Sequence, residues 1–169
     1  MDIFLQQMIN GLVLGSVYAL VALGYTMVYG IIQLINFAHG EVLMFGALIA
    51  WTVAGLLQPA FPGMPGWVVL IIAATVACTL AALLNFTIEK VAYRPLRNSP
   101  RLAPLITAIG MSLLLQTVAM IIWKPNPKPF PSLLPVTPYE IGGAVISPTD
   151  LLILSLTVVL LVALVWLVN

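Results

Sequence analysis

Charged side chains are scarce in this chain of 169 residues, which contains five acidic residues, six basic residues and one histidine. Uncharged runs extend over 47 residues between Glu41 and Glu89, 22 between Arg101 and Lys124, and 19 after Asp150. A water-soluble domain of this size exposes too much surface to be built from such a sequence. A helix of roughly 20 apolar residues, in contrast, crosses a hydrocarbon core of about 30 Å. The chain is therefore predicted to be a polytopic membrane protein.

Other scarcities exclude several kinds of chemistry. The single cysteine, Cys78, leaves no intrachain disulfide and no metal cluster. A net charge of +1 gives no electrostatic reason to bind nucleic acid. His39 is the only histidine and has no nearby Ser–Asp pair, and no lysine belongs to a phosphate-binding Gly-Lys-Ser/Thr loop. We expect no enzyme activity, no bound cofactor or metal, and no ATP hydrolysis by this chain itself.

Apolar residues make up 62% of the sequence, and the mean hydropathy is +1.15. Their runs predict an all-α, polytopic transmembrane helical bundle of about five spans, near residues 7–29, 42–57, 67–88, 102–123 and 150–168. The polar segment 30–41 predicts a broken or re-entrant element between the first two spans. The segment Gln58–Gly66 is expected to mark the end of the second span, because Pro59, Pro62 and Pro65 in it cannot continue a helix. The proline-rich stretch 124–149 predicts an extended surface loop that ends in a short β-turn near Gly142.

Small residues recur every four positions in three of the predicted spans, which is typical of helices that pack closely. These stripes are Gly11, Gly15 and Ala19; Gly46, Ala50 and Ala54; and Ala73, Ala77 and Ala81. The basic stretch indicates orientation, because positive residues are retained on the cytoplasmic side. Its members are Lys90, Arg94, Arg97 and Arg101. Counting spans from this stretch predicts an extracytoplasmic N-terminus and an extracytoplasmic proline-rich loop.

Asn36, His39 and Glu41 are the main polar residues within the apolar part of the chain. Ionisable groups at membrane depth are costly and typically line a pathway or pair with something, so these three are candidates for the translocation pathway. A purely structural role is the alternative. In that case Glu41 lies in the first turn of the second span, stabilised by the helix dipole, Gly40 supplies a bend, Asn36 caps the helix, and His39 makes an interfacial hydrogen bond.

Glu89, Arg94 and Arg97 form the second candidate group, either as a contact with a cytoplasmic partner or as a positively charged anchor. If the third helix continues through Tyr93, Glu89 lies one turn before it and is expected to pair with neighbours of Lys90 or with Arg94 at the membrane edge. Pro95 is expected to end the third helix and to bias Arg94 away from helical geometry.

Several ordered motifs of this chain resemble the N-terminal half of the LivH-type permeases of branched-chain amino-acid ABC transporters. They are Gly24-Tyr25-Thr26-Met27-Val28-Tyr29-Gly30-Ile31-Ile32, Ile35-Asn36-Phe37-Ala38-His39-Gly40-Glu41, Glu89 through Arg97, and Ser99-Pro100-Arg101-Leu102-Ala103-Pro104-Leu105-Ile106 with Ala108-Ile109-Gly110-Met111-Ser112. Permeases of this type are longer, so residues 1–169 are expected to be a single transmembrane permease domain that forms the N-terminal portion of a longer fold.

The resemblance implies a multi-pass subunit of the bacterial inner membrane that imports branched-chain or related amino acids. It also implies a second homologous permease, two cytoplasmic ATPase subunits that use the ATP, and an extracytoplasmic amino-acid-binding protein as partners. Two alternatives stay open: a small homo-oligomeric channel or gradient-driven carrier, for which His39 and Glu41 are the available ionisable groups, and an inactive permease fragment.

Overall fold

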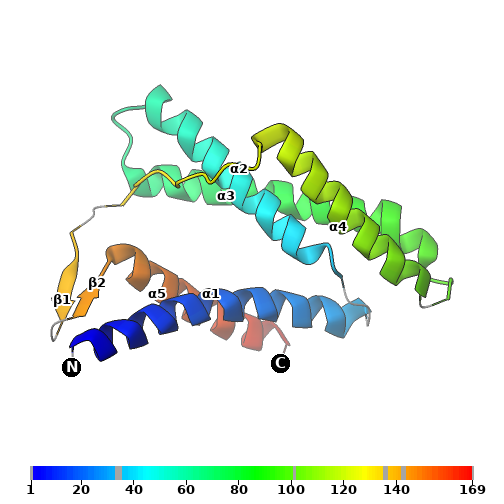
Figure 1. Ribbon diagram of the computed structural model, residues 1–169, viewed down its shortest axis with the longest axis horizontal. Helices are drawn as coiled ribbons and strands as arrows, with labels where there is room; N and C mark the ends of the chain where they lie inside the picture. The colour runs from blue at the N-terminus through cyan, green and yellow to red at the C-terminus, as the bar shows by residue number, and fades with distance from the viewer. Residues whose placement is uncertain (1, 33–35, 101, 135–136, 142–143, 169) are drawn as a thin grey trace. The chain divides into compact units, whose positions relative to one another are not determined.

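The computed structural model describes residues 2–32, 36–100, 102–134, 137–141 and 144–168, and it is helical apart from one short hairpin (Figure 1). The long helices are α1 (Asp2–Ile32), α2 (His39–Ala60), α3 (Gly66–Ile88), α4 (Leu102–Trp123) and α5 (Pro148–Val168). Five helices are long and apolar enough to cross a membrane, with the third continuing to Leu96. The predicted all-α bundle of about five spans is confirmed. Residues 36–38 are not helical, so the predicted break near residues 30–41 is also present there.

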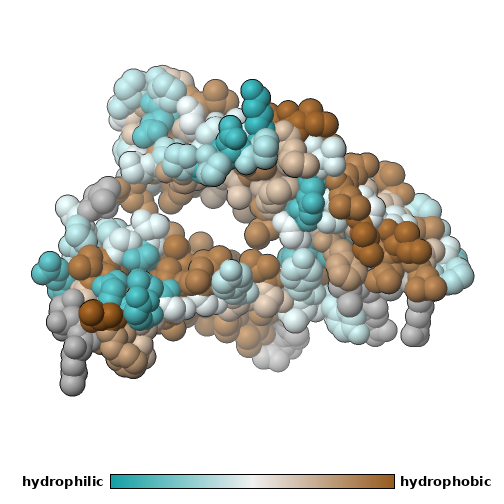
Figure 2. Space-filling model, in the orientation of Figure 1, coloured by the Kyte–Doolittle hydropathy of each residue, from teal (hydrophilic) through white to brown (hydrophobic). Residues whose placement is uncertain are grey.

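The chain divides into two compact units, Met1–Thr26 with Leu134–Asn169, and Met27–Leu133. Each unit is described by itself below. Across both units, much of the visible surface of the helices is apolar (Figure 2), as a lipid environment requires.

Helix α2 ends at Ala60, within the segment Gln58–Gly66 that was expected to mark its end. Pro59 itself, which was expected not to continue a helix, still lies inside it. A proline removes one backbone donor, and here it does so in the last turn, where few helical hydrogen bonds follow. The backbone N–H of Phe61 still donates to the Leu57 carbonyl at 2.9 Å and closes the helix.

The third helix does not stop before the basic stretch but continues with a changed hydrogen-bond pattern. A π-helical turn, η1 (Glu89–Tyr93), is followed by a 3₁₀ turn, η2 (Arg94–Leu96). The N–H of Arg94 donates to the carbonyl of Glu89, five residues earlier, and Arg94 has φ −58° and ψ −42°. The expectation that Pro95 pushes Arg94 out of helical geometry is therefore wrong. The wider π turn gives the proline ring the space that a regular helix denies it.

The small-residue stripes of α2 and α3 face each other. A Cβ placed on Gly46 would lie 3.8 Å from the Cβ of Ala81, which is ordinary van der Waals contact. Ala54 and Ala73 are buried in one apolar cluster. A second cluster joins these helices to α4 and consists of Ala38, Val42, Phe45, Ile88, Leu115 and Ala119. Figure 1 shows α2, α3 and α4 against one another. Gly11 and Gly15 of the α1 stripe, by contrast, have open space beside them among the described residues.

The chain is extended after α4, as the prolines predict, and residues 124–134 contain no helix or strand. The segment is tied down at two points. The Trp51 Nε1–H donates to the carbonyl of Pro129 at 2.9 Å. Further along, the Leu133 carbonyl lies so close to Gly66, at the start of α3, that any Cβ there would collide with it. Figure 1 shows the extended segment after α4 passing the start of α3. Glycine at position 66 is what allows this crossing.

In the other unit, a two-stranded hairpin precedes α5. Strand β1 (Tyr139–Ile141) pairs antiparallel with β2 (Ala144–Ile146), while the predicted turn at Gly142 falls outside the described residues. The side-chain amide of Gln6 in α1 both donates to and accepts from the Val145 backbone, at 3.0 and 2.7 Å. Ser147 and Asp150 form a reciprocal capping box at the start of α5, at 3.0 and 3.2 Å.

Candidate functional site

The first turn of α2 brings the predicted polar residues against two other helices of the same unit. Asn36 is 9% exposed and starts this turn. Its backbone carbonyl accepts from the N–H of His39 at 3.1 Å, and its side-chain Oδ1 accepts from the N–H of Ala38 at 3.0 Å. Such a side-chain-to-backbone turn favours a helix start immediately after it.

Tyr93 contributes the second donor to Asn36. Its hydroxyl, on the π turn that follows α3, donates to Asn36 Oδ1 at 2.7 Å. The two residues are 57 positions apart in the sequence. The amide oxygen thus has two donors, one local and one from a different helix, and this fixes the start of α2 against the end of α3.

Glu41 lies in the first turn of α2 and is bound to α4. Its Oε1 accepts from the hydroxyl of Ser112 at 2.8 Å and from the amide Nε2 of Gln116 at 2.8 Å. Both donors therefore reach the same carboxyl oxygen, one from a hydroxyl and one from an amide of α4. The helix N-terminus adds favourable positive potential at the same place.

The position of Glu41 along α4 bears on its role. Ser112 lies at the middle of α4, a helix of 22 residues, which at 1.5 Å per residue is about 33 Å long. The first turn of α2 therefore begins about halfway along a helix that has the length of a membrane span. Glu41 thus lies in the first turn of a helix, as the structural alternative expects. That first turn lies beside the middle of α4, as expected for a residue of the translocation pathway.

His39 is the first residue of α2 and is partly buried, between Asn36 and Glu41 in sequence. All three residues of the first candidate group therefore lie at one helix end.

The second candidate group is only partly brought together. Arg97 Nη2 lies 3.2 Å from Glu89 Oε1, and their side chains are 65% and 31% exposed. The expected pairing of Glu89 with Arg94 is replaced by this pair, because the π and 3₁₀ turns change which residues follow one another on the helix surface. Arg94 is exposed. An ion pair this open contributes little to stability, so these residues present charge at the end of the third span.

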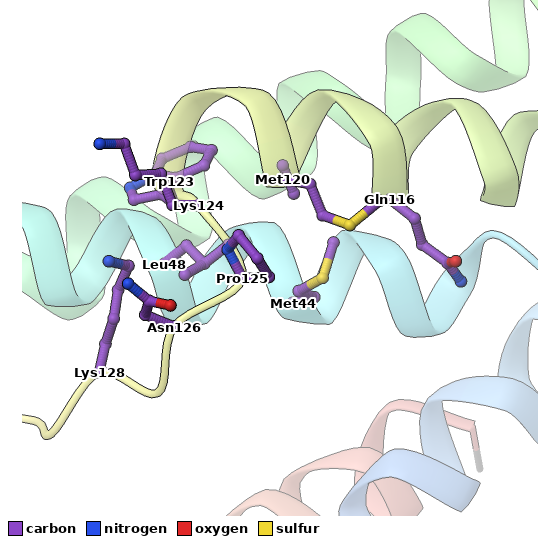
Figure 3. A pocket seen from close by; sticks show the side chains of 10 residues that line it. Met44, Leu48, Gln116, Met120, Trp123, Lys124, Pro125, Asn126 and Lys128 are labelled. Atoms are coloured by element: carbon purple, nitrogen blue, oxygen red, sulfur yellow. The ribbon is translucent and has the colours of Figure 1, made fainter.

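A pocket of about 410 Å³ lies between α2, the C-terminal half of α4 and the extended segment after it. Figure 3 shows Lys128 and Asn126 at one end of this pocket and Gln116 at the other, with the thioethers of Met44 and Met120 between them. Gln116 therefore belongs both to the pocket and to the hydrogen bonds of Glu41.

Sequence reasoning missed the partners of the predicted residues. Ser112 and Gln116 are four residues apart in an apolar helix, a spacing that places both on one helix face. That pair of polar residues is the signal that points to the partner of Glu41. Tyr93 stands out less, because tyrosine near the end of a span also serves as an interfacial anchor.

The described residues form five long apolar helices, and in the unit Met27–Leu133 a carboxylate and an amide are held by side chains of neighbouring helices. These features define a multi-pass α-helical membrane protein. The chain belongs to the permease components of branched-chain amino acid transport systems, because the model of that family matches residues 7–169.

Two relatives from bacteria are closely similar. The chain is 46% identical over 159 residues, which is 91% of its length, to the high-affinity branched-chain amino acid transport system permease protein BraD of Pseudomonas aeruginosa. It is 53% identical over 114 residues, 67% of its length, to the permease protein LivH of Escherichia coli K12. The matched segments cover 51% and 36% of these relatives, so the chain spans about half of their length or less. No solved structure matches the chain.

Proposed function

We propose that this chain forms part of the translocation pathway of an ATP-driven importer of branched-chain amino acids. The observation that carries the proposal is Glu41, held by Ser112 and Gln116 halfway along α4, in a chain of this permease family. A carboxylate at that depth is costly, and ionisable groups that occur there typically mark a pathway for a solute or a proton. The ammonium group of an amino acid is the matching partner for it.

The partners follow from the permease family and from the chemistry that the chain lacks. We expect a second homologous permease, two cytoplasmic ATPase subunits and an extracytoplasmic amino-acid-binding protein, with ATP used by the ATPases alone. The location is the bacterial inner membrane, with the N-terminus outside and the charged end of the third span inside. Glu89, Arg94 and Arg97 then face the cytoplasm, where the ATPases bind.

The experiment has two parts, in the native host. The tagged chain is isolated from its membrane in mild detergent, and the recovered proteins are identified by mass spectrometry. Uptake of radiolabelled L-leucine is then measured in cells with and without the gene, after ATP depletion by arsenate or after a protonophore. We expect recovery of both ATPases and a second permease, and uptake that is lost with ATP depletion and retained with the protonophore.

Two results contradict the proposal. Recovery of the chain alone or as a homo-oligomer, with uptake that the protonophore abolishes, indicates a gradient-driven carrier. Uptake that is unchanged by loss of the gene indicates a fragment without transport activity.

A further inference from the structure

The pocket between α2, α4 and the extended segment has two chemically different parts. Its middle is lined by Met44, Leu48 and Met120 and is apolar. One end is formed by Asn126 and Lys128, which belong to the extended segment after α4 (Figure 3). A volume of about 410 Å³ is within the usual range for small-molecule sites.

The extended segment is rich in hydrogen-bond acceptors. Pro125, Pro127, Pro129 and Pro131 alternate with other residues and have no backbone N–H, while every residue keeps its carbonyl. Extended, proline-rich backbone makes no internal hydrogen bonds, so its carbonyls stay available to water or to a ligand. The carbonyl of Pro129 already accepts from Trp51. An ammonium group, with three donors, is the ligand that this backbone suits.

Lys128 provides a positive charge, the partner for a carboxylate, at the end of the pocket that the extended segment forms. Its Nζ lies 4.8 Å from the centroid of the Trp51 ring and is partly buried. The ring holds the ammonium at the pocket by an interaction worth about 0.5–1 kcal/mol at exposed sites, which a carboxylate easily exceeds. A cation on a segment that keeps its carbonyls and has few N–H donors therefore suits a group that carries a carboxylate and an ammonium on one carbon.

We propose that this pocket binds the transported α-amino acid in transit. Its carboxylate lies at Lys128 and Asn126, its ammonium at the carbonyls of the extended segment, and its branched side chain against Met44 and Met120. Flexible thioethers adapt to side chains of different shape, which suits a site for several aliphatic amino acids. Gln116 connects the far end of the pocket to Glu41, where the ammonium is held next. This site rests on the proposed function and adds to it.

The test uses a leucine analogue with a diazirine in its side chain, added to cells of the native host during uptake and then activated by light. Labelled peptides of the chain are mapped by mass spectrometry. We expect labels on the peptides that carry Met44 or Met120, blocked by excess L-leucine and not by leucinol, which has no carboxylate. Lys128→Gln should reduce this labelling about tenfold, which corresponds to loss of one charge-assisted hydrogen bond. Lys128→Arg should retain most of it.

Lys90→Gln is the matched control, because Lys90 is an exposed lysine of the same unit that does not line the pocket. It should leave labelling unchanged. If uptake is normal and the labels are confined to other helices, the proposed amino-acid site in this pocket is overturned, while the proposed function is unaffected. If phosphatidylglycerol displaces the label from the pocket and L-leucine does not, the pocket is a lipid site, and the proposed amino-acid site is also overturned. Absence of gene-dependent leucine uptake in the wild type contradicts the proposed function itself.

Discussion

The hydrogen bonds of Glu41 predict that removing its donors Ser112 and Gln116 lowers the stability of the protein, whereas removing the carboxylate as well restores it. Replacing the donors, in the double variant Ser112→Ala and Gln116→Leu, leaves the carboxylate without its two 2.8 Å contacts. Hydrogen bonds to a charged group are worth about 1.5–3 kcal/mol in soluble proteins, but interhelical ones in membranes average about 0.6 kcal/mol. We therefore expect the double variant to lose about 1–3 kcal/mol of stability.

Adding Glu41→Leu to that double variant should restore stability. An acidic or basic side chain at the centre of a spanning helix costs about 2.5–3.5 kcal/mol by insertion scales, and the third substitution removes that cost. Unfolding of the purified protein by SDS in mixed micelles, followed by tryptophan fluorescence, measures both steps. Leucine uptake should be absent in the triple variant despite its recovered stability. If the triple variant is no more stable than the double variant, Glu41 is not held at membrane depth and the reasoning is refuted.

Three further predictions concern single contacts. Gly66→Ala should detach the extended segment from the start of α3, because a Cβ collides with the Leu133 carbonyl. We expect faster protease cleavage of that segment, and unchanged cleavage would contradict the close approach of Leu133 to Gly66. Tyr93→Phe should cost about 0.5–1.5 kcal/mol through the lost hydrogen bond to Asn36, measured by the same SDS titration, and no loss would mean that the bond adds nothing. Asp150→Ala should cost about 1 kcal/mol, because it removes the carboxylate that accepts from the Ser147 N–H in the capping box of α5. The loss should be seen as faster amide hydrogen exchange at the start of α5, with Glu140→Ala as the control.

Much of the fold could be predicted from the sequence, because a bilayer imposes a simple rule on it. Runs of apolar residues between sparse charges located the five long helices of the described residues, and the stripes in residues 46–54 and 73–81 indicated faces for close packing. The ends of the helices were harder to predict. Pro59 and Pro95 were expected to stop helices, but one lies in a last turn and the other follows a π turn that accommodates its ring.

The candidate site was half visible in the sequence. Glu41 and Asn36 stood out because polar residues are rare in apolar segments. Their partners Tyr93, Ser112 and Gln116 come from distant parts of the chain, and nothing in a single sequence states which helix faces which. The stagger that brings the first turn of α2 to the middle of α4 is likewise a property of packing.

The π turn at Glu89–Tyr93 has a geometric consequence for the charged end of the third span. A π turn holds one more residue than an α-helical turn, so returning it to α-helix would rotate all that follows by about 100° about the helix axis. Tyr93 would swing away from Asn36, and Arg97 would leave Glu89. One extra residue in a single turn thus sets the angular phase of the whole basic end. Deleting one residue from this turn would therefore change the direction in which the basic side chains point, as well as shortening the helix.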